Sequence, residues 1–178
     1  MYSGYLFVVL SLTALLDLPT YSNAKDVEFD YYVYAQQWPE SVCQQTIHVH
    51  KHNCSIGENT TAWTVHGLWP SSNTNETLPA FCEPSATFNV SALKSIMSDL
   101  EARWPNLYTD EPPNDFWKHE WDKHGTCALA AKVVKNEKEY FQLALDLNLK
   151  LNVFGNMKMR GVYPLKDKSY LYSDVMST

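Results

Sequence analysis

The segment 116–127, FWKHEWDKHGTC, constrains the fold most, because it places two histidines, a glutamate and a lysine within six consecutive positions. Drawn as a helix with about 100° per residue, it has His119 at zero, Lys123 at about 40°, Glu120 at about 100° and His124 at about 140°. These four side chains share one arc of the helix. Clusters of this kind move protons, so we expect the arc to line a cleft.

The other faces of this helix are predicted to differ from the first. Trp117 and Trp121 fall at about 160–200°, beside the arc, and are expected to join the core. Lys118 and Asp122 fall at about 260–300°, where a charge pair four residues apart suits solvent. Gly125 is placed to end the helix in a left-handed cap.

Residues 1–24 have the pattern of a secretory signal: an apolar run at 5–16, a proline, and a small-x-small cleavage site ending at Ala24. No Lys or Arg precedes the apolar run, and a buried first helix is the alternative. The run is too short to span a bilayer. We therefore expect one secreted domain at 25–178, without a membrane anchor.

The cysteines and glycosylation sequons fit a secreted chain. In an oxidising route the cysteines are expected to form two disulfides, and sequence alone leaves three pairings open. The cysteines are Cys43, Cys54, Cys82 and Cys127. Two or three of the four sequons are expected to carry glycans. Their asparagines are Asn53, Asn59, Asn75 and Asn89.

The charge of the chain excludes a general phosphate-binding surface. The formal net charge is −6, and loss of Asp17 with the signal makes it −5. A polyanionic substrate must then be held by a local cluster. Protonation of all six histidines would bring the charge to −5 + 6 = +1, so an acidic compartment suits a nucleic-acid substrate better than neutral pH.

Two strands are predicted before the histidine-rich helix. Residues 29–38 are dense in Tyr, Val and Phe. Residues 62–69 form the second candidate, with Thr64, His66 and Leu68 on one face, and Pro70 is expected to end it. Helical spacing predicts two further helices, at residues 89–104 with Asn89 as N-cap, and at residues 137–153.

Two reactions that such a cluster could perform are disfavoured. A zinc hydrolase needs its two histidines one helical turn apart, whereas His124 is five residues after His119. The alternating histidines at 48, 50 and 52 could hold a metal on one face of a strand, but a polar loop is the preferred interpretation. Cys127 is expected in a disulfide, which excludes it as a thiolate nucleophile. No metal or cofactor is predicted.

The third reaction is phosphoryl transfer by a paired general acid and base. It needs a second histidine across a cleft, and His66 lies at the end of a predicted strand. Gly67 permits a close backbone approach, and Trp69 could stack on a base, worth about 1–3 kcal/mol. Ordinary strand packing is the alternative for His66 and Trp69 when each is taken alone.

Residues 66–70, HGLWP, together with 116–127 resemble the two active-site segments of the ribonuclease T2 family, in the family's order and separation. The similarity runs from about Phe29 to about Pro164. It implies an α+β fold with a central antiparallel sheet flanked by helices. It also implies a monomeric, secreted or lysosomal (endosomal) endoribonuclease that cleaves single-stranded RNA, not DNA, through a 2′,3′-cyclic phosphate.

The resemblance assigns a role to each matching residue. His124 would be the general base on the 2′-hydroxyl and His66 the general acid for the 5′-oxygen. His119 would hold the phosphate, and Glu120 and Lys123 would stabilise the transition state. In the same way, Trp69 would belong to the base-binding wall, and the disulfides would pair Cys43 with Cys54 and Cys82 with Cys127.

The sequence departs from the family pattern at two places. Ser71 stands where some members carry an aspartate that contacts the base. Members normally continue past residues 161–164 with further strands and disulfides, whereas this sequence ends at Thr178. We therefore expect an unpaired sheet edge at the strand bearing His66. An inactive truncated isoform, or a secreted glycoprotein ligand with a vestigial nuclease site, are the alternatives to an active enzyme.

Overall fold

The computed structural model describes residues 8–12, 28–46, 49, 52–61, 63–73, 78–163 and 168–176. The predicted signal lies outside these residues apart from 8–12, and so does the sequon at Asn75. Within the described ranges no helix is long and apolar enough to cross a membrane.

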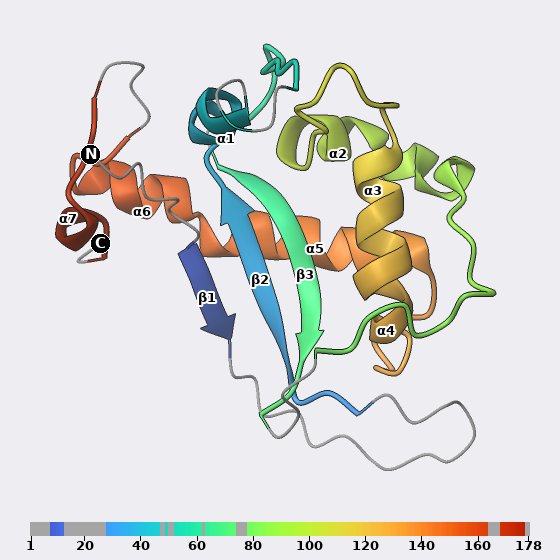
Figure 1. The fold of residues 1–178 in the computed structure, drawn as a ribbon. Helices are drawn as coiled ribbons and strands as arrows, with labels where there is room; N and C mark the ends of the chain where they lie inside the picture. The colour runs from blue at the N-terminus through green and yellow to red at the C-terminus, as the bar shows by residue number, and fades with distance from the viewer. Residues whose placement is uncertain are drawn as a thin grey trace.

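Three antiparallel strands form the sheet, in the order β1 (Val8–Leu12), β2 (Tyr31–Gln37), β3 (Thr64–Ser71) (Figure 1). The strands predicted from the sequence correspond to β2 and β3. The expectation that Pro70 ends the second strand is wrong, because β3 continues to Ser71. Among the described strands β3 lies at an edge of the sheet, so one side of it has no ladder to lose when proline lacks its N–H.

A β-bulge interrupts the pairing of β2 with β3. Ala35 lies opposite Gly67 and Gln36 lies opposite Val65, which leaves His66 as an extra residue in β3. As a result Val65 and Leu68 both pack into the core. The simple alternation that put His66 and Leu68 on one face is wrong, because an extra residue shifts the face of every residue beyond it.

The helix predicted at 89–104 forms as two pieces. The 3₁₀ helix η2 (Val90–Ile96) is followed by the α-helix α2 (Met97–Arg103). Asn89 is the N-cap as predicted, since its Oδ1 accepts a hydrogen bond of 3.1 Å from the Ser91 N–H.

The helix predicted at 137–153 is α5 (Glu137–Leu151), and Asn136 caps its first turn. It ends at Asn152, whose backbone is left-handed with φ 39°. The short helices α6 (Val153–Met159) and α7 (Tyr172–Met176) follow, and α1 (Pro39–Gln45) comes after β2.

The histidine-rich segment folds as three consecutive helical pieces. These are α3 (Asp115–Glu120), the π-helical turn η3 (Trp121–Gly125) and α4 (Thr126–Ala128). Gly125 does not end the helix in a left-handed cap, as its φ is −61°. A Cβ at this position would instead lie closer than 3.0 Å to the ring of Trp121, so glycine is needed for close packing.

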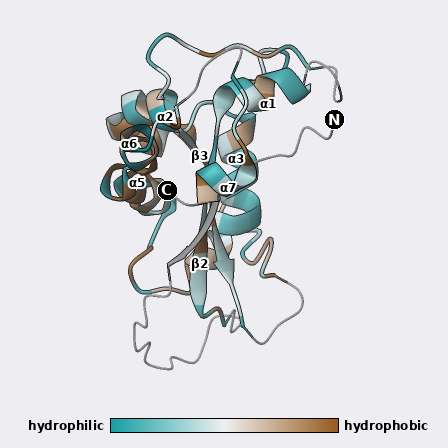
Figure 2. Ribbon diagram, turned by 90° about the vertical axis from the view of Figure 1, so that its left-hand side faces the viewer, coloured by the Kyte–Doolittle hydropathy of each residue, from teal (hydrophilic) through white to brown (hydrophobic). Residues whose placement is uncertain are grey.

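One main core joins the helices to the sheet. Helix α5 crosses behind the sheet and α3 stands beside β3 (Figure 1), and Figure 2 shows α5 and α2 on the same side of the strands. The largest fully buried side chains of this core are Trp104, Tyr34, Tyr140, Phe141, Leu68, Leu93 and Leu100. A smaller core lies under α6 and α7 and contains Trp63, Met157, Val162 and Val175.

We predict that Gly125→Ala destabilises the protein, although alanine is the better helix former. The added methyl group would overlap the Trp121 ring, and overpacking of this kind costs about 1–3 kcal/mol. Gly57→Ala is the control, because its nearest contact would be Thr60 Oγ1 at 3.3 Å in an exposed loop. Urea denaturation measures both changes. Equal stabilities of Gly125→Ala and the unmodified chain would contradict the packing described here.

Candidate active site

The π-helical turn decides how the histidines of the second motif are presented. The N–H of Thr126 donates to the carbonyl of Trp121, five residues earlier, where an α-helix would use a four-residue step. In so wide a turn, residue i+5 lies nearly above residue i. Around the helix axis, the side chains of His119 and His124 are therefore separated by less than the 140° that a regular α-helix would give them.

The two motifs meet at the ring of Trp69. The ring centroids of Trp69 and His124 lie 5.5 Å apart, and those of Trp69 and His66 lie 5.4 Å apart. On its other side His66 faces Phe116 of α3 at 5.9 Å. The histidine of the bulged strand and the histidine of the π turn thus both contact one indole.

A hydrogen bond fixes this indole to α3. Trp69 Nε1 donates to Glu120 Oε2 over 3.0 Å, and Glu120 is 2% exposed. Gly67 lies beneath this bond, where a Cβ would come closer than 3.0 Å to both bonded atoms. The close approach expected at Gly67 is confirmed. The groups that approach its backbone are the side chains of Trp69 and Glu120, which join the two motifs.

Burial and mutual repulsion lower the pKa values of the three histidines. The pKa of His66 falls to about 4, through desolvation first and then the charges of His119 and Lys123. The pKa of His124 falls to about 3, through desolvation and then the charges of Lys123, His119 and His66. Desolvation and Lys123 also lower the pKa of His119, which is more exposed. Free of substrate, His66 and His124 are therefore mainly neutral above about pH 4, near the ammonium group of Lys123.

The carboxyl group of Glu120 is shifted in the opposite direction. Burial raises its pKa to about 7, while the hydrogen bond from Trp69 and the charge of Lys123 act to lower it. At acid pH this group is therefore protonated, and the site carries no buried negative charge to balance Lys123.

Buried tryptophans support both motifs, although the sequence analysis treated them only as core. Trp104 Nε1 donates to the carbonyl of the bulged residue His66 over 3.1 Å, and Trp117 Nε1 donates to the carbonyl of Trp104. The hydroxyl of Tyr140 donates to the carbonyl of Leu68 over 2.9 Å. A buried indole needs an acceptor, and that rule was the available signal that these residues position the site.

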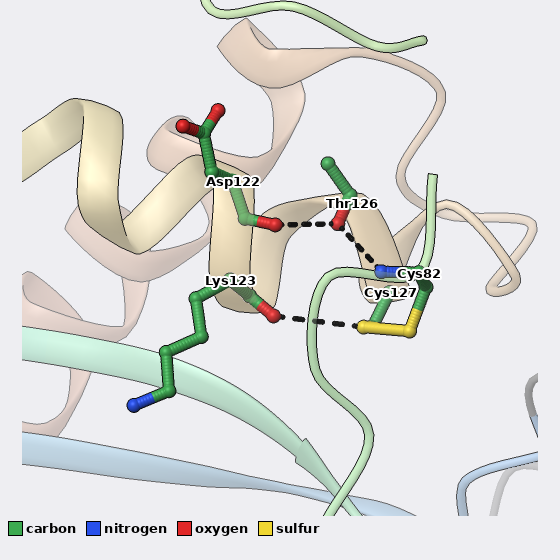
Figure 3. Close-up of a disulfide and its surroundings, with 5 residues drawn as sticks. All are labelled: Cys82, Asp122, Lys123, Thr126 and Cys127. Carbon is green, nitrogen blue, oxygen red and sulfur yellow. Dashed lines mark hydrogen bonds between the residues drawn. A yellow bond between two sulfur atoms is a disulfide. The ribbon is translucent and has the colours of Figure 1, made fainter. Parts of the chain in front are cut away.

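Both predicted disulfides form, Cys43 with Cys54 and Cys82 with Cys127. The second bonds the loop after β3 to α4, which directly follows the π turn (Figure 3). Thr126 Oγ1 donates to the carbonyl of Asp122 and accepts the N–H of Cys82. The Cys127 sulfur lies 3.6 Å from the carbonyl of Lys123, which is a contact and not a hydrogen bond, because a disulfide sulfur carries no proton.

A hollow of about 170 Å³ adjoins His66. Phe116 and Tyr108 supply aromatic surface, and Gln37 and Asn106 supply amide groups that can both donate and accept. The hydroxyl of Ser71, in contrast, donates to the carbonyl of Trp69 within β3 and is buried. Ser71 therefore does not present a polar group to a ligand in this structure.

The remaining predicted residues lie away from this cluster. Asn53, Asn59 and Asn89 are exposed. His52 bonds Asp110 over 3.1 Å and stacks on Tyr108. In the described part of the chain no three potential metal ligands come together, and the histidines at 48 and 50 lie outside it.

The fold corresponds to that of an endoribonuclease. The crystal structure of human RNase T2 matches with a TM-score of 0.65 at 32% identity, covering 80% of this chain and 67% of that one. The agreement includes the mixed helices and the small antiparallel sheet.

The family model of the ribonuclease T2 family matches residues 29–178, so the chain belongs to that family and is a T2-type endoribonuclease. Ribonuclease Oy of Magallana gigas is 38% identical over 147 residues, which are 83% of this chain and 67% of that protein. Extracellular ribonuclease LE of Solanum lycopersicum is 32% identical over 89% of this chain and 66% of its own. The chain thus spans about two thirds of the length of these relatives.

The pKa of Glu120 is about 7, and the hydrogen bond from Trp69 acts to lower it. We therefore predict that Trp69→Phe, which removes this bond, raises the pKa of Glu120 above that value. Phenylalanine keeps an aromatic ring at the same position. Trp38→Phe is the control, since Trp38 Nε1 bonds no described residue. A carbon-13 NMR titration of the glutamate carboxyls measures the shift. An unchanged Glu120 titration would mean that the hydrogen bond does not form in solution.

Proposed function

We propose that the protein cleaves single-stranded RNA by metal-independent transesterification, with His124 as general base and His66 as general acid. One observation carries the proposal: the imidazoles of His66 in β3 and His124 in η3 both contact the Trp69 ring, and the charge of His66 acts on the pKa of His124. In-line attack on one phosphorus requires a base and an acid that can both reach it.

The reaction balances with these two groups alone. His124 takes the proton of the 2′-hydroxyl, and the new bond from that oxygen to phosphorus forms as the bond to the 5′-oxygen breaks. His66 gives its proton to the departing 5′-oxygen. The products are a 2′,3′-cyclic phosphate and a 5′-hydroxyl, and one proton has moved from His66 to His124.

The lowered pKa values match these roles once a phosphate is bound. His124 is neutral over the working pH range, as a general base must be. The positive charge of Lys123 has no buried counter-ion at acid pH, so the phosphate supplies one. Its negative charge raises the pKa of His66 and His119, which favours the protonated acid and the phosphate-holding imidazolium. Lys123 and protonated Glu120 then stabilise the charge that develops in the transition state.

The hollow beside His66 fits one base of the RNA. Phe116 and Tyr108 offer stacking surfaces, and the amide of Gln37 can bond a base edge as donor or acceptor. The amide of Asn106 bonds the Tyr108 N–H and the Pro112 carbonyl and so shapes this hollow. Trp69 is the aromatic wall next to the reacting phosphate.

We propose further that the protein acts outside the cytosol, in the extracellular space or in a lysosomal or endosomal compartment. Two disulfides, the signal pattern of residues 1–24 and exposed sequon asparagines at 53, 59 and 89 support this. A relative from Solanum lycopersicum is named an extracellular ribonuclease. An acidic compartment also keeps Glu120 protonated and favours the protonated form of His66 once a phosphate is bound.

We predict that His66→Ala and His124→Ala each lower kcat on a short RNA by about 10²–10⁴-fold, because each removes one proton-transfer group. Lys94→Ala is the control, since Lys94 is exposed on η2 and its charge does not act on these histidines. Mass spectrometry of the products is expected to show cyclic-phosphate ends, unaffected by a chelator. Chelator-sensitive cleavage would overturn the metal-independent mechanism. A folded but inactive chain would favour the glycoprotein ligand.

A second prediction concerns pH. The pH profile of kcat/KM reports the free enzyme, in which His66 must be protonated to act as general acid. Because the pKa of His66 is lowered, the basic limb of this profile is expected below pH 6.5. Lys123→Met removes a charge that lowers this pKa, and the basic limb is expected to move to higher pH while the rate falls. Lys94→Met, whose charge does not act on these histidines, is expected to leave the limb in place. An unmoved limb in Lys123→Met would contradict the assignment.

A further inference from the structure

Phe81 presents an aromatic ring to solvent at the cost of a strained backbone. Its side chain is 58% exposed and its φ is +54°, in the left-handed region that costs a non-glycine residue roughly 1–2 kcal/mol. The conformation is held in place from both sides. The N–H of Phe81 donates to the carbonyl of Lys123 in the π turn over 2.9 Å, and the next residue, Cys82, is in the disulfide to α4. Packing in the core does not explain why an aromatic ring stands at this exposed position.

The ring lines a second, larger hollow that is continuous with the catalytic cluster. This hollow has a volume of about 670 Å³ and is lined by Phe81, Phe116 and His119, among others. Phe116 also lines the smaller hollow beside His66. A strand of RNA whose phosphate is held by His119 therefore has aromatic surface on both sides of it.

The charges of the larger hollow suit a base and oppose a phosphate. Glu111, Asp115 and Asp122 line it, and only Lys118 is a permanent positive charge there, already paired with Asp122. Carboxylates repel phosphate oxygens, whereas they accept hydrogen bonds from the exocyclic amino groups of cytosine, adenine and guanine. Uracil has no such amino group.

We propose that this hollow binds the base of one further nucleotide of single-stranded RNA, stacked on Phe81, with bases that carry an amino group preferred over uracil. The proposal rests on the proposed function for the kind of ligand. It adds a third base position to the one beside His66 and to the wall at Trp69. The strained loop is then explained as a device that keeps the ring facing the ligand.

Binding of 2′-O-methyl oligonucleotides to the whole chain tests the proposal, because these ligands lack the attacking hydroxyl and stay uncleaved. We expect Phe81→Ala to bind a hexacytidylate roughly 5- to 100-fold more weakly, the range of one lost stacking contact, and to bind a dinucleotide normally. Phe81→Trp is expected to retain tight binding. Tyr172→Ala removes an equally exposed ring from α7 and is expected to change nothing.

The base preference supplies a second readout. The unmodified chain is expected to bind hexacytidylate more tightly than hexauridylate, and Asp115→Asn is expected to narrow that difference. Phe81→Gly relieves the backbone strain, so its thermal stability is expected to equal or exceed that of the unmodified chain while its binding falls like that of Phe81→Ala. This separates loss of the ring from loss of the fold.

Several results would overturn the proposal. Hexanucleotide binding that is unchanged in Phe81→Ala would show that the ring takes no base. Equal losses for dinucleotide and hexanucleotide would place the ring at the scissile phosphate instead. Failure of the proposed function is a separate result, namely no cleavage of an unmodified dinucleotide by the unmodified chain, and the binding series is read independently of it.

Discussion

The hydrogen bond from the Trp69 indole to the buried carboxyl of Glu120 is the contact on which the site depends. It joins a strand to a helix that is 51 residues later in the chain, and only the absence of a side chain at Gly67 leaves room for it. Because this bond fixes the indole, it also fixes the ring that both imidazoles contact. A buried carboxyl without this donor would be a polar group with no compensation for its desolvation.

Around that contact, the backbone is held in two irregular forms by partners from elsewhere in the fold. The bulge at His66 is stabilised by the indole of Trp104, which satisfies the carbonyl that an extra residue leaves unpaired. The π turn is anchored by Thr126 and by the disulfide of Cys127 to the loop after β3 (Figure 3). Irregular backbone of this kind is common at functional sites because it re-aims side chains that regular structure would turn away.

The electrostatics of the empty site and of the occupied site are complementary. Burial keeps His66 and His124 largely neutral and Glu120 protonated at mildly acid pH, so Lys123 is the main charge near them before RNA binds. In the proposed mechanism an anionic phosphate reverses this balance and lets imidazolium form where the reaction needs it. In the proposed binding mode the carboxylates of the larger hollow at Phe81 repel phosphates and leave that hollow to a base.

The sequence by itself determined the chemistry: which residues could transfer protons, where the helices at 89–104 and 137–153 begin, and, through the family resemblance, which cysteines pair. These depend on residue type and short-range spacing. Only the tertiary structure decided the bulge at His66, the π turn, the packing role of Gly125 and the exposed ring of Phe81. Helix and strand periodicity assumes a regular backbone. These four features depend on contacts between residues distant in sequence, which stabilise irregular backbone or close packing that periodicity does not predict.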